Sequence, residues 1–420
     1  MKVQLAYGQG CLAVDMPDGR TSLIEPSHAP GLLNEKAAVF DALDHPIESP
    51  PLKTLLRPDS RICIIFTDIT RATPNERLIP WLLEKLSFLP REHIVLINAL
   101  GTHRPNTPEE LETMLTPFVV QNYEVLNHEA EDPEELIHFG STRDGTPVLI
   151  NRHAAEADLR IVTGFIEPHF FAGFSGGPKG ILPGVAGLET VMSNHGAHPI
   201  SNPQAAFGIL DGNPIWEEMR DVALRVGPSF LLNVTLNPEK QITGVFAGHI
   251  IKAHREGAEF VRRSAMQKVD RPFEVVVTTN SGYPLDLNLY QGVKGMSAGA
   301  RILQPGGALI LAAECREGVP PDSPFDKLLR QAKNPAELLA LITQAREPFP
   351  EQWQAHIQAL IQNRADVYLH SSLPPEIVQA THLKPCPDIT QTVMAELERR
   401  GPQARVAVLP QGPLTIPYLA

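Results

Sequence analysis

The sequence predicts an α/β fold with two domains, each built on a mainly parallel sheet. Continuous apolar runs rich in β-branched residues recur along the chain, and polar residues and then a helical segment follow these runs. Buried runs that alternate with helices are typical of parallel strands joined by crossover helices. The length of 420 residues suits two or three domains, and the apolar fraction of 43% is enough for ordinary buried cores.

The first expected domain, residues 1–267, opens on a β-hairpin and continues with strand–helix units. Residues 2–6 and 11–15 are extended around a glycine-containing turn. Thr107 and Pro108 have the form of a helix N-cap followed by proline at the first helical position. The later strands expected in this domain are 62–66, 94–97, 159–162, 231–237 and 241–248, and the last two form a second hairpin.

The second expected domain, residues 273–405, is smaller and follows a candidate linker at 268–272. The strand–helix pattern restarts there, and Asn334 with Glu337 has the form of a capping box at the start of a helix. A short strand at 406–409 begins a tail, 406–420, for which a return to the first domain is an option. The other strands expected in this domain are 273–277, 308–313 and 367–370.

The composition argues against several classes of protein. The net charge is −12, whereas a non-specific nucleic-acid binder needs a cationic surface. The chain has no apolar leader at its start and no run of the about 20 apolar residues that a membrane helix requires. None of the four cysteines forms a CxxC pair, so no zinc ribbon is expected. We therefore expect a cytoplasmic protein that binds neither nucleic acid nor membranes.

Polar side chains follow the expected strands at the points where those strands end. Ligands of open α/β sheets bind beyond the carboxyl ends of the strands, so these residues are candidates for a site. Because both domains present such residues, we expect an active-site cleft between the domains. The residues are Asp68, Arg71, His103 and His169 in the first domain, and Tyr290, Gln291 and Lys294 in the second.

Residues 167–184 are the densest segment of the chain in glycine and polar residues. Gly173, Gly176 and Gly177 precede Lys179, and glycine allows a backbone to approach a ligand closely. The spacing is not that of a Walker A loop. Taken alone, the segment is as consistent with a glycine-rich turn and a solvated lysine as with a ligand loop.

Three histidines adjoin loops expected at the same edge of the first sheet. His103, His169 and His195 suggest a three-histidine zinc site as the generic interpretation. No HExxH motif is present, and no acidic or cysteine ligand lies at short metal-binding spacing from them. A structural role for each histidine therefore stays open at this point.

Five ordered motifs resemble those of the nickel-dependent lactate racemase family, and the resemblance covers nearly the whole chain. The motifs are Asp68-Ile-Thr-Arg71, Gly101-Thr-His103-Arg-Pro105, His169 with Lys179, Asn194-His195, and Tyr290-Gln-Gly-Val-Lys294. The resemblance implies a two-domain α/β enzyme that carries a nickel-pincer nucleotide, pyridinium-3,5-bisthiocarboxylic acid mononucleotide. In that cofactor a ring carbon and two sulfurs bind nickel, and a protein histidine completes the coordination.

The resemblance also implies roles for individual residues. His195 matches the nickel ligand, Lys179 the lysine joined to or contacting the cofactor, and His103 and His169 the two general acid/bases. The segment that grips the cofactor matches Asp68, Ile69, Thr70 and Arg71. The substrate-binding positions match Arg71, Tyr290, Gln291 and Lys294, with Trp353 as a wall for the substrate side chain.

The expected activity is racemisation or epimerisation of a small 2-hydroxy acid, lactate or a related acid, by hydride transfer to the cofactor ring. A square-planar sulfur-rich site suits nickel, and a cofactor that brings its own sulfur makes cysteine ligands unnecessary. Partners are then the substrate and the proteins that make the cofactor. Two alternatives stay open: a non-catalytic binder of an anionic nucleotide or metabolite, and a zinc hydrolase that uses the three histidines.

Overall fold

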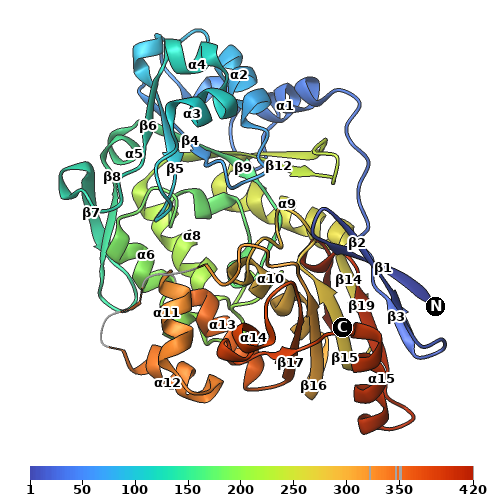
Figure 1. Cartoon of the computed structure of the whole chain (residues 1–420). Coiled ribbons are helices and arrows are strands. Elements are labelled where there is room, and N and C mark those ends of the chain that lie inside the picture. The colour runs from blue at the N-terminus through green and yellow to red at the C-terminus, as the bar shows by residue number, and fades with distance from the viewer. Residues whose placement is uncertain (321–322, 346–347, 350–351, 420) are drawn as a thin grey trace. The chain divides into compact units, whose positions relative to one another are not determined.

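The computed structural model describes residues 1–320, 323–345, 348–349 and 352–419, and it divides into two compact units. One unit comprises His28–His195 and Asn202–Ser264, and we call it the first unit. The second unit comprises Met1–Ser27, Gly196–Ser201 and the segment from Ala265 to the C-terminus. Figure 1 labels the elements of both units.

The first unit contains a six-stranded sheet in the order β13-β12-β9-β4-β5-β6. All neighbouring strands are parallel except β12 and β13, which form an antiparallel hairpin. The order in which strands are added to the sheet changes direction between β4 and β9. From β4 the chain continues to β5 and β6 on one side, and from β9 it continues to β12 on the other side. The strands are β4 (Ile62–Thr67), β5 (Ile94–Ala99), β6 (Glu124–Asn127), β9 (Leu159–Phe165), β12 (Ser229–Leu236) and β13 (Ile242–His249).

Helices α1 to α4 lie together on one side of this sheet (Figure 1), where their apolar residues share one core with the strands. Val39, Leu82 and Leu115 of these helices are fully buried in that core. Thr107 caps α3 in a capping box with Glu110, which confirms the helix start predicted from the sequence. The helices of this unit are α1 (Glu35–Asp44), α2 (Asn75–Lys85), α3 (Pro108–Leu115), α4 (Pro117–Asn122), α5 (Arg152–Glu156), α6 (Leu188–Asn194), α8 (Pro214–Val226) and α9 (Ile250–Ala265).

Two short antiparallel pairs complete the first unit. β7 (Leu136–Ser141) pairs with β8 (Pro147–Asn151), and β10 (Pro168–His169) pairs with β11 (Gly173–Phe174). The second pair follows β9 directly, so it lies at the carboxyl end of the sheet.

The second unit contains a six-stranded, wholly parallel sheet in the order β18-β17-β16-β15-β19-β3. The hairpin of β1 (Lys2–Tyr7) and β2 (Gly10–Asp15) shares a core with α15 and the strands, where Leu5, Val277 and Val393 are all fully buried. The strands are β3 (Thr21–Leu23), β15 (Phe273–Thr279), β16 (Leu303–Ala312), β17 (Asp366–His370), β18 (Lys384–Pro385) and β19 (Val406–Leu409). The helices are α7 (Ala197–Ile200), α10 (Leu289–Ala300), α11 (Pro324–Gln331), α12 (Pro335–Gln344), α13 (Gln352–Gln362), α14 (Pro375–Ala380) and α15 (Ile389–Arg400).

The α/β class and the parallel sheets are confirmed, but the units differ from the expected domains at both ends of the chain. Residues 1–27 were expected in the first domain, yet β3 pairs with β19 and so belongs to the second sheet. The tail 406–420 does not return to the first unit, because β19 lies between β15 and β3. Part of the candidate linker 268–272 is β14 (Met266–Val269), which pairs with β20 (Ile416–Leu419). Pairing between segments distant in the sequence is what the linear pattern could not show.

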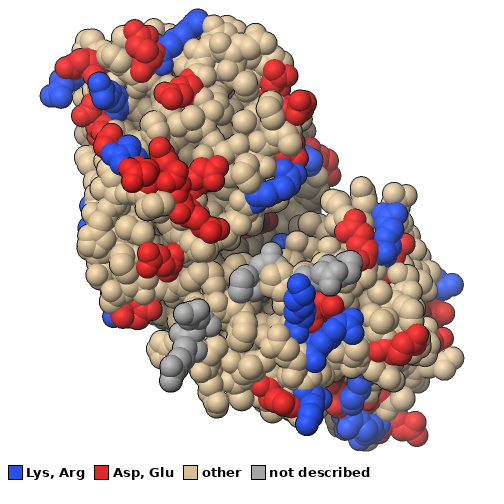
Figure 2. All heavy atoms as spheres, turned by 60° about the vertical axis from the view of Figure 1, so that its left-hand side comes forward, with Lys and Arg blue, Asp and Glu red and all other residues tan. Residues whose placement is uncertain are grey.

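The surface in Figure 2 has lysine and arginine side chains interspersed with aspartate and glutamate. Among the described residues on that face, the cationic side chains form no continuous strip of the kind that binds a nucleic-acid backbone. Within the described part of the chain, each helix is too short or too polar to span a bilayer.

Candidate active site

The loop after β4 places a buried carboxylate at the end of the first sheet. Asp68 is 3% exposed, and its Oδ2 accepts a hydrogen bond from His103 Nδ1 at 2.5 Å. The Thr70 hydroxyl donates to Asp68 Oδ1 at 2.8 Å. Burial opposes ionisation, yet the hydrogen bond from His103 and the positive charge of Arg71 hold the pKa of Asp68 below its usual range. Asp68 is therefore ionised at neutral pH.

His103 lies on the loop after β5, and its side chain is 45% exposed. Because an ionised carboxylate can only accept hydrogen bonds, the ring nitrogen that faces Asp68 carries a proton. The lone pair of the neutral ring is then on Nε2, and the charge of Asp68 stabilises the ring when Nε2 takes a second proton. His103 therefore has the form of a general base whose accepting atom is Nε2.

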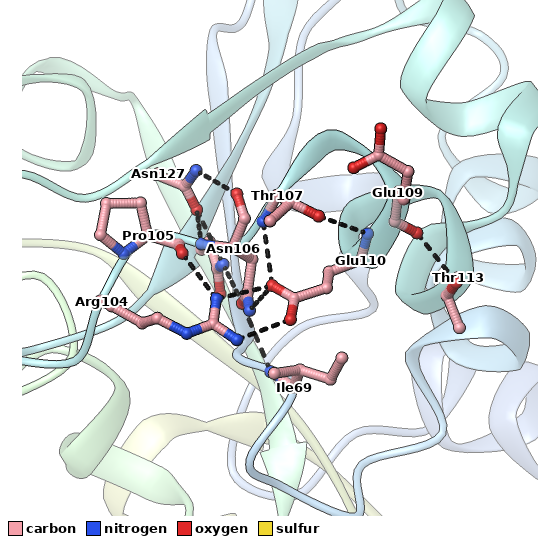
Figure 3. A network of polar contacts seen from close by, with 10 residues as sticks. Ile69, Arg104, Pro105, Asn106, Thr107, Glu109, Glu110, Thr113 and Asn127 are labelled. Carbon is pink, nitrogen blue, oxygen red and sulfur yellow. Dashed lines mark hydrogen bonds and ion pairs between the residues drawn. The ribbon is translucent and has the colours of Figure 1, made fainter.

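A polar network ties the loop after β4 to the loop after β5 (Figure 3). Asn106 Oδ1 accepts a hydrogen bond from Ile69 N at 3.4 Å. Asn106 Nδ2 donates to the Glu110 carboxylate at 2.8 Å, and Arg104 donates to the same carboxylate through both terminal nitrogens. Ile69 and Arg104 each follow one member of the carboxylate–imidazole pair, so the network fixes the two loops that carry the pair.

The segment after β9 forms the short hairpin of β10 and β11, which carries His169, and then a glycine-rich loop. Gly177 has a φ of 57°, and a Cβ at this position would lie 2.4 Å from the His254 ring. Its N–H donates to Asn233 Oδ1 at 2.8 Å. The loop is thus held against α9 and β12, and these contacts set the position of Lys179 two residues later. The glycine at 177 is required by both the backbone angle and the close approach.

One phenylalanine ring joins three of the predicted site residues. Phe171 is 3% exposed, and its ring centroid lies 4.6 Å from that of His169 and 4.9 Å from that of His195. Both imidazoles meet it nearly at right angles, which is a favourable arrangement for aromatic pairs. Lys179 Nζ lies 5.9 Å from the same centroid, within cation–π distance. The structure therefore brings His195 to the same ring as His169 and Lys179 of the glycine-rich segment.

Positive charge gathers at this end of the sheet. Burial and the nearby positive charge of Arg71 lower the pKa of Lys179 to about 7. Burial and the charge of Lys179 lower the pKa of His195 well below its usual range. His195 is consequently a neutral imidazole at neutral pH, which is the form that binds a metal. An anion bound here would relieve the repulsion between Arg71 and Lys179.

His169 has its proton on the opposite nitrogen from that of His103. The Ala172 N–H donates to His169 Nδ1 at 3.2 Å, so Nδ1 carries the lone pair and the neutral ring has its proton on Nε2. His169 is also much more buried than His103, at 9% exposed. The two histidines therefore differ in burial, in hydrogen-bond partner and in tautomer.

Of the predicted substrate-binding residues, Arg71 lies in the first unit and the other four lie in the second, most of them on α10. Tyr290 and Trp353 are in contact, because Trp353 Nε1 donates to the Tyr290 hydroxyl at 3.1 Å. Gln291 lies in the first turn of α10, where its N–H donates to the capping side chain of Asn288. A Cβ at Gly295 would lie 2.2 Å from a backbone oxygen of β15, so this glycine lets α10, with Lys294, pack directly on the strand.

The described residues contain no group of three or more histidine, cysteine, aspartate or glutamate side chains arranged to hold a metal ion. His103, His169 and His195 therefore do not form the three-ligand centre that a zinc hydrolase would need. A metal bound by His195 would therefore not be held by a cluster of three such side chains within the described part of the chain.

Sequence reasoning did not identify Phe171, Asn233 or His254 as parts of the site. Phe171 lies within the predicted glycine-rich segment, so aromatic residues flanking His169 were the available signal. Asn233 is an amide within an apolar strand, and His254 is a histidine on a charged helix. Only the folded loop shows that these two side chains hold it.

Comparisons with known proteins agree with this architecture. The family described as "Lactate racemase N-terminal domain" matches residues 7–208, and "Lactate racemase C-terminal domain" matches residues 269–416. A lactate racemase of Thermoanaerobacterium thermosaccharolyticum is 34% identical over 417 residues, 98% of this chain and 97% of that protein. A lactate racemase of Lactiplantibacillus plantarum is 37% identical over 385 residues, 90% of each chain.

Comparison with solved structures also finds proteins of the same fold. The lactate racemase apoprotein of Thermoanaerobacterium thermosaccharolyticum superposes with a TM-score of 0.91, at 34% identity, over 99% of this chain and all of that one. A Thermotoga maritima protein shares the fold, with a TM-score of 0.66 at 20% identity over 93% of this chain and all of that one.

A parallel α/β fold with buried histidines and a lysine beyond the carboxyl ends of its strands, together with these relatives, defines an enzyme of the racemase type, an isomerase. The chain belongs to the lactate racemase family.

Proposed function

We propose that the protein racemises lactate, or a closely related 2-hydroxy acid, with a nickel-pincer nucleotide as cofactor. The observation that supports this most directly is the arrangement of His169, Lys179 and His195 around the Phe171 ring. The two relatives that match nearly the whole chain are both named lactate racemase, which makes lactate the first substrate to test.

The residues present fit an anionic mononucleotide that carries its own metal ligands. Arg71 and Lys179 supply positive charge for a phosphate or carboxylate, and Thr70 adds a hydroxyl. His195 supplies one neutral imidazole, which would complete the coordination of a nickel whose other ligands belong to the cofactor. We assign His195 as that ligand, Lys179 as the residue that contacts or joins the cofactor, and residues 68–71 as the segment that grips it.

When bound, the pyridinium ring of the cofactor supplies a hydride acceptor, which the protein need only orient. His103 Nε2 takes the hydroxyl proton of one enantiomer, and Asp68 stabilises the imidazolium that forms. We assign His169 to the hydroxyl of the other enantiomer. In the tautomer described above its Nε2–H can donate a proton, and Nε2 can accept one only after the ring proton has moved to Nδ1. Each histidine returns its proton when the planar keto acid is reduced.

Two histidines are required by geometry. A 2-hydroxy acid is held by its carboxylate, and its α-hydrogen must face the cofactor in either enantiomer. With those two directions fixed, exchanging enantiomers exchanges the hydroxyl and the side chain. A single base cannot lie within the ~3 Å hydrogen-bond reach of both hydroxyl positions.

The second unit supplies the residues that we assign to the substrate. Lys294 is a compact positive charge suited to a carboxylate, and Gln291 can donate or accept a hydrogen bond at the hydroxyl. Arg71 of the first unit contacts the substrate as well as the cofactor. The hydrogen-bonded pair of Tyr290 and Trp353 walls the substrate side chain.

The deciding experiment is to express the protein with the proteins that make the cofactor and to measure its intact mass, nickel content and racemisation of lactate. We expect near-stoichiometric nickel in the native protein and loss of nickel in a folded His195→Ala variant. His198→Ala is the matched control, because His198 lies three residues away on the exposed side of α7. Full nickel occupancy in His195→Ala would remove His195 as the ligand.

The same experiment should distinguish the roles of Lys179 and Lys294. Lys179→Ala should lose the cofactor, whereas Lys294→Ala should keep it and show a raised KM or lowered kcat. The reverse pattern would exchange the two assignments. A loaded native protein that racemises no 2-hydroxy acid would favour the non-catalytic anion binder, and zinc in place of nickel would favour a hydrolase.

A further inference from the structure

A chain of buried polar groups lies behind His195 and has no role in the mechanism above. Asn194 is the last residue of α6 and is fully buried, and Glu218 on α8 is 9% exposed. A polar amide and a carboxylate at such depth stabilise the fold only if their hydrogen bonds are satisfied. The hydrogen-bond partners of Asn194 and Glu218 show how these two residues act on His195.

The hydrogen bonds of Asn194 fix which way its amide faces. Its Nδ2 donates to Glu218 Oε2 at 2.9 Å and to the Ile215 carbonyl oxygen at 3.2 Å, and both of these atoms are acceptors only. The amide oxygen must therefore be the atom that lies 3.0 Å from His195 Nδ1. An amide oxygen cannot donate, so His195 Nδ1 carries the proton and the lone pair of the neutral ring is on Nε2.

Glu218 ends this hydrogen-bonded series of residues. Its Oε1 accepts a hydrogen bond from Arg143 N at 3.0 Å, and its Oε2 accepts from Asn194. An ionised carboxylate satisfies both donors, whereas a neutral amide at this position would present one oxygen and one NH2 group. Such an amide would satisfy only one of the two donors, and turning Asn194 over would then place its NH2 group against the His195 ring.

We propose that Asn194 and Glu218 are positioning residues that hold His195 in the tautomer whose Nε2 can bind nickel. A ring with its proton on Nε2 could not bind a metal through that nitrogen, so the chain determines whether the site can be loaded. The inference rests on the proposed ligand role of His195. It gives a role to Asn194, which so far was only the neighbour of His195 in a family motif, and it adds Glu218, which lies outside those motifs. Both residues set the proton of the ligand and do not touch cofactor or substrate.

The first test reads the tautomer in the cofactor-free protein. Long-range proton–nitrogen NMR spectra of protein labelled with ¹⁵N in histidine distinguish the two neutral tautomers, and His195→Ala assigns the signal. We expect the native ring to carry its proton on Nδ1, and Glu218→Gln to shift a measurable population to the Nε2–H form. Glu217→Gln is the matched control, because Glu217 is the adjacent carboxylate on α8 but bonds to Arg143 Nη2 and Gly212 N.

The second test reads nickel retention after co-expression with the cofactor-making proteins. Glu218→Gln should weaken retention by about tenfold, the lower end of the loss seen when a partner of a metal ligand is removed, and Glu217→Gln should not. A native His195 with its proton on Nε2, or an unchanged tautomer in Glu218→Gln, would overturn the inference. Full retention in Glu218→Gln would also overturn it if His195→Ala loses nickel, whereas retention in both variants would overturn the ligand role of His195.

Discussion

The loop after β5 and the segment after β9 each carry one of the proposed acid/base histidines, but they hold it by different means. His103 is half exposed and bonds to an ionised carboxylate, whereas His169 is buried against aromatic rings and accepts a backbone N–H. The first arrangement places the ring proton on Nδ1 and stabilises a positive ring. The second places it on Nε2 and offers no counter-charge through that bond. Two residues of the same type are thus held in different neutral tautomers.

The largest effect should come from removing either histidine. We expect His103→Ala and His169→Ala each to lower net racemisation by about 10²–10⁴-fold, the usual contribution of an acid/base group. Each should keep substantial oxidation of one enantiomer, and not the same one. The measurement is the half-reaction of a loaded enzyme with a single enantiomer, followed through the trapped keto acid. If both variants lost the same half-reaction, the two-base arrangement would be wrong.

A change at Asp68 should remove much of the difference between the two histidines. Asp68→Asn withdraws the charge that stabilises the protonated His103 ring, so we expect kcat to fall by about 10²-fold. Thr70→Val removes a donor to Asp68 but keeps the carboxylate charge, so at equal cofactor content kcat should fall by less than about tenfold. Steady-state kinetics on protein of known cofactor content give both values. Undiminished kcat in Asp68→Asn would show that the carboxylate does not assist His103.

The packing of Phe171 against His169 and His195 can be tested by measuring the stability of the protein. Phe171→Leu removes the ring that packs against His169 and His195, and we expect a loss of about 1–2 kcal/mol in the free energy of unfolding. Urea unfolding of the cofactor-free protein measures it. Phe118→Leu, at a ring that is 57% exposed, is the control and should change stability much less. Equal effects in the two variants would mean that Phe171 does not organise the segment.

The smallest effect should come from the cap that follows His103. Thr107→Ala removes a capping hydroxyl from α3, and a loss of about 1 kcal/mol in the free energy of unfolding is expected. Thr107→Ser keeps the hydroxyl and should behave as the native protein. A loss in Thr107→Ser as large as that in Thr107→Ala would contradict the role of the capping hydroxyl.

The local structure could be predicted well from the sequence. The apolar runs that became β4, β5, β9 and β15 were visible because parallel strands are buried on both faces and read as continuous apolar segments. Asp68, His103 and His169 could be placed at the sheet edge because each follows such a run. The roles of individual residues came from family resemblance, since spacing alone left a zinc site and a plain turn open.

The remaining part depends on partners that are distant in the sequence. The tautomer of His103 depends on Asp68, which is 35 residues away, and nothing in the order of residues indicates that bond. His254 is 77 residues from Gly177 in the chain, yet its ring occupies the space that a larger residue at 177 would need. Residues 1–27 belong to the second unit through the pairing of β3 with β19 and through the core that the β1–β2 hairpin shares with the strands, and no local pattern shows these contacts.

That pairing has a consequence for how the protein is made. Thr21 of β3 lies opposite Val406 of β19, so the strand that leaves the ribosome early has no sheet to join until almost the whole chain has emerged. The main segments of the first unit, His28–His195 and Asn202–Ser264, are complete by then and can fold while synthesis continues. Strands that lie so far apart in the sequence pair slowly. Throughout translation, β3 is therefore an unpaired edge, and its length of three residues limits how readily it can pair with another chain.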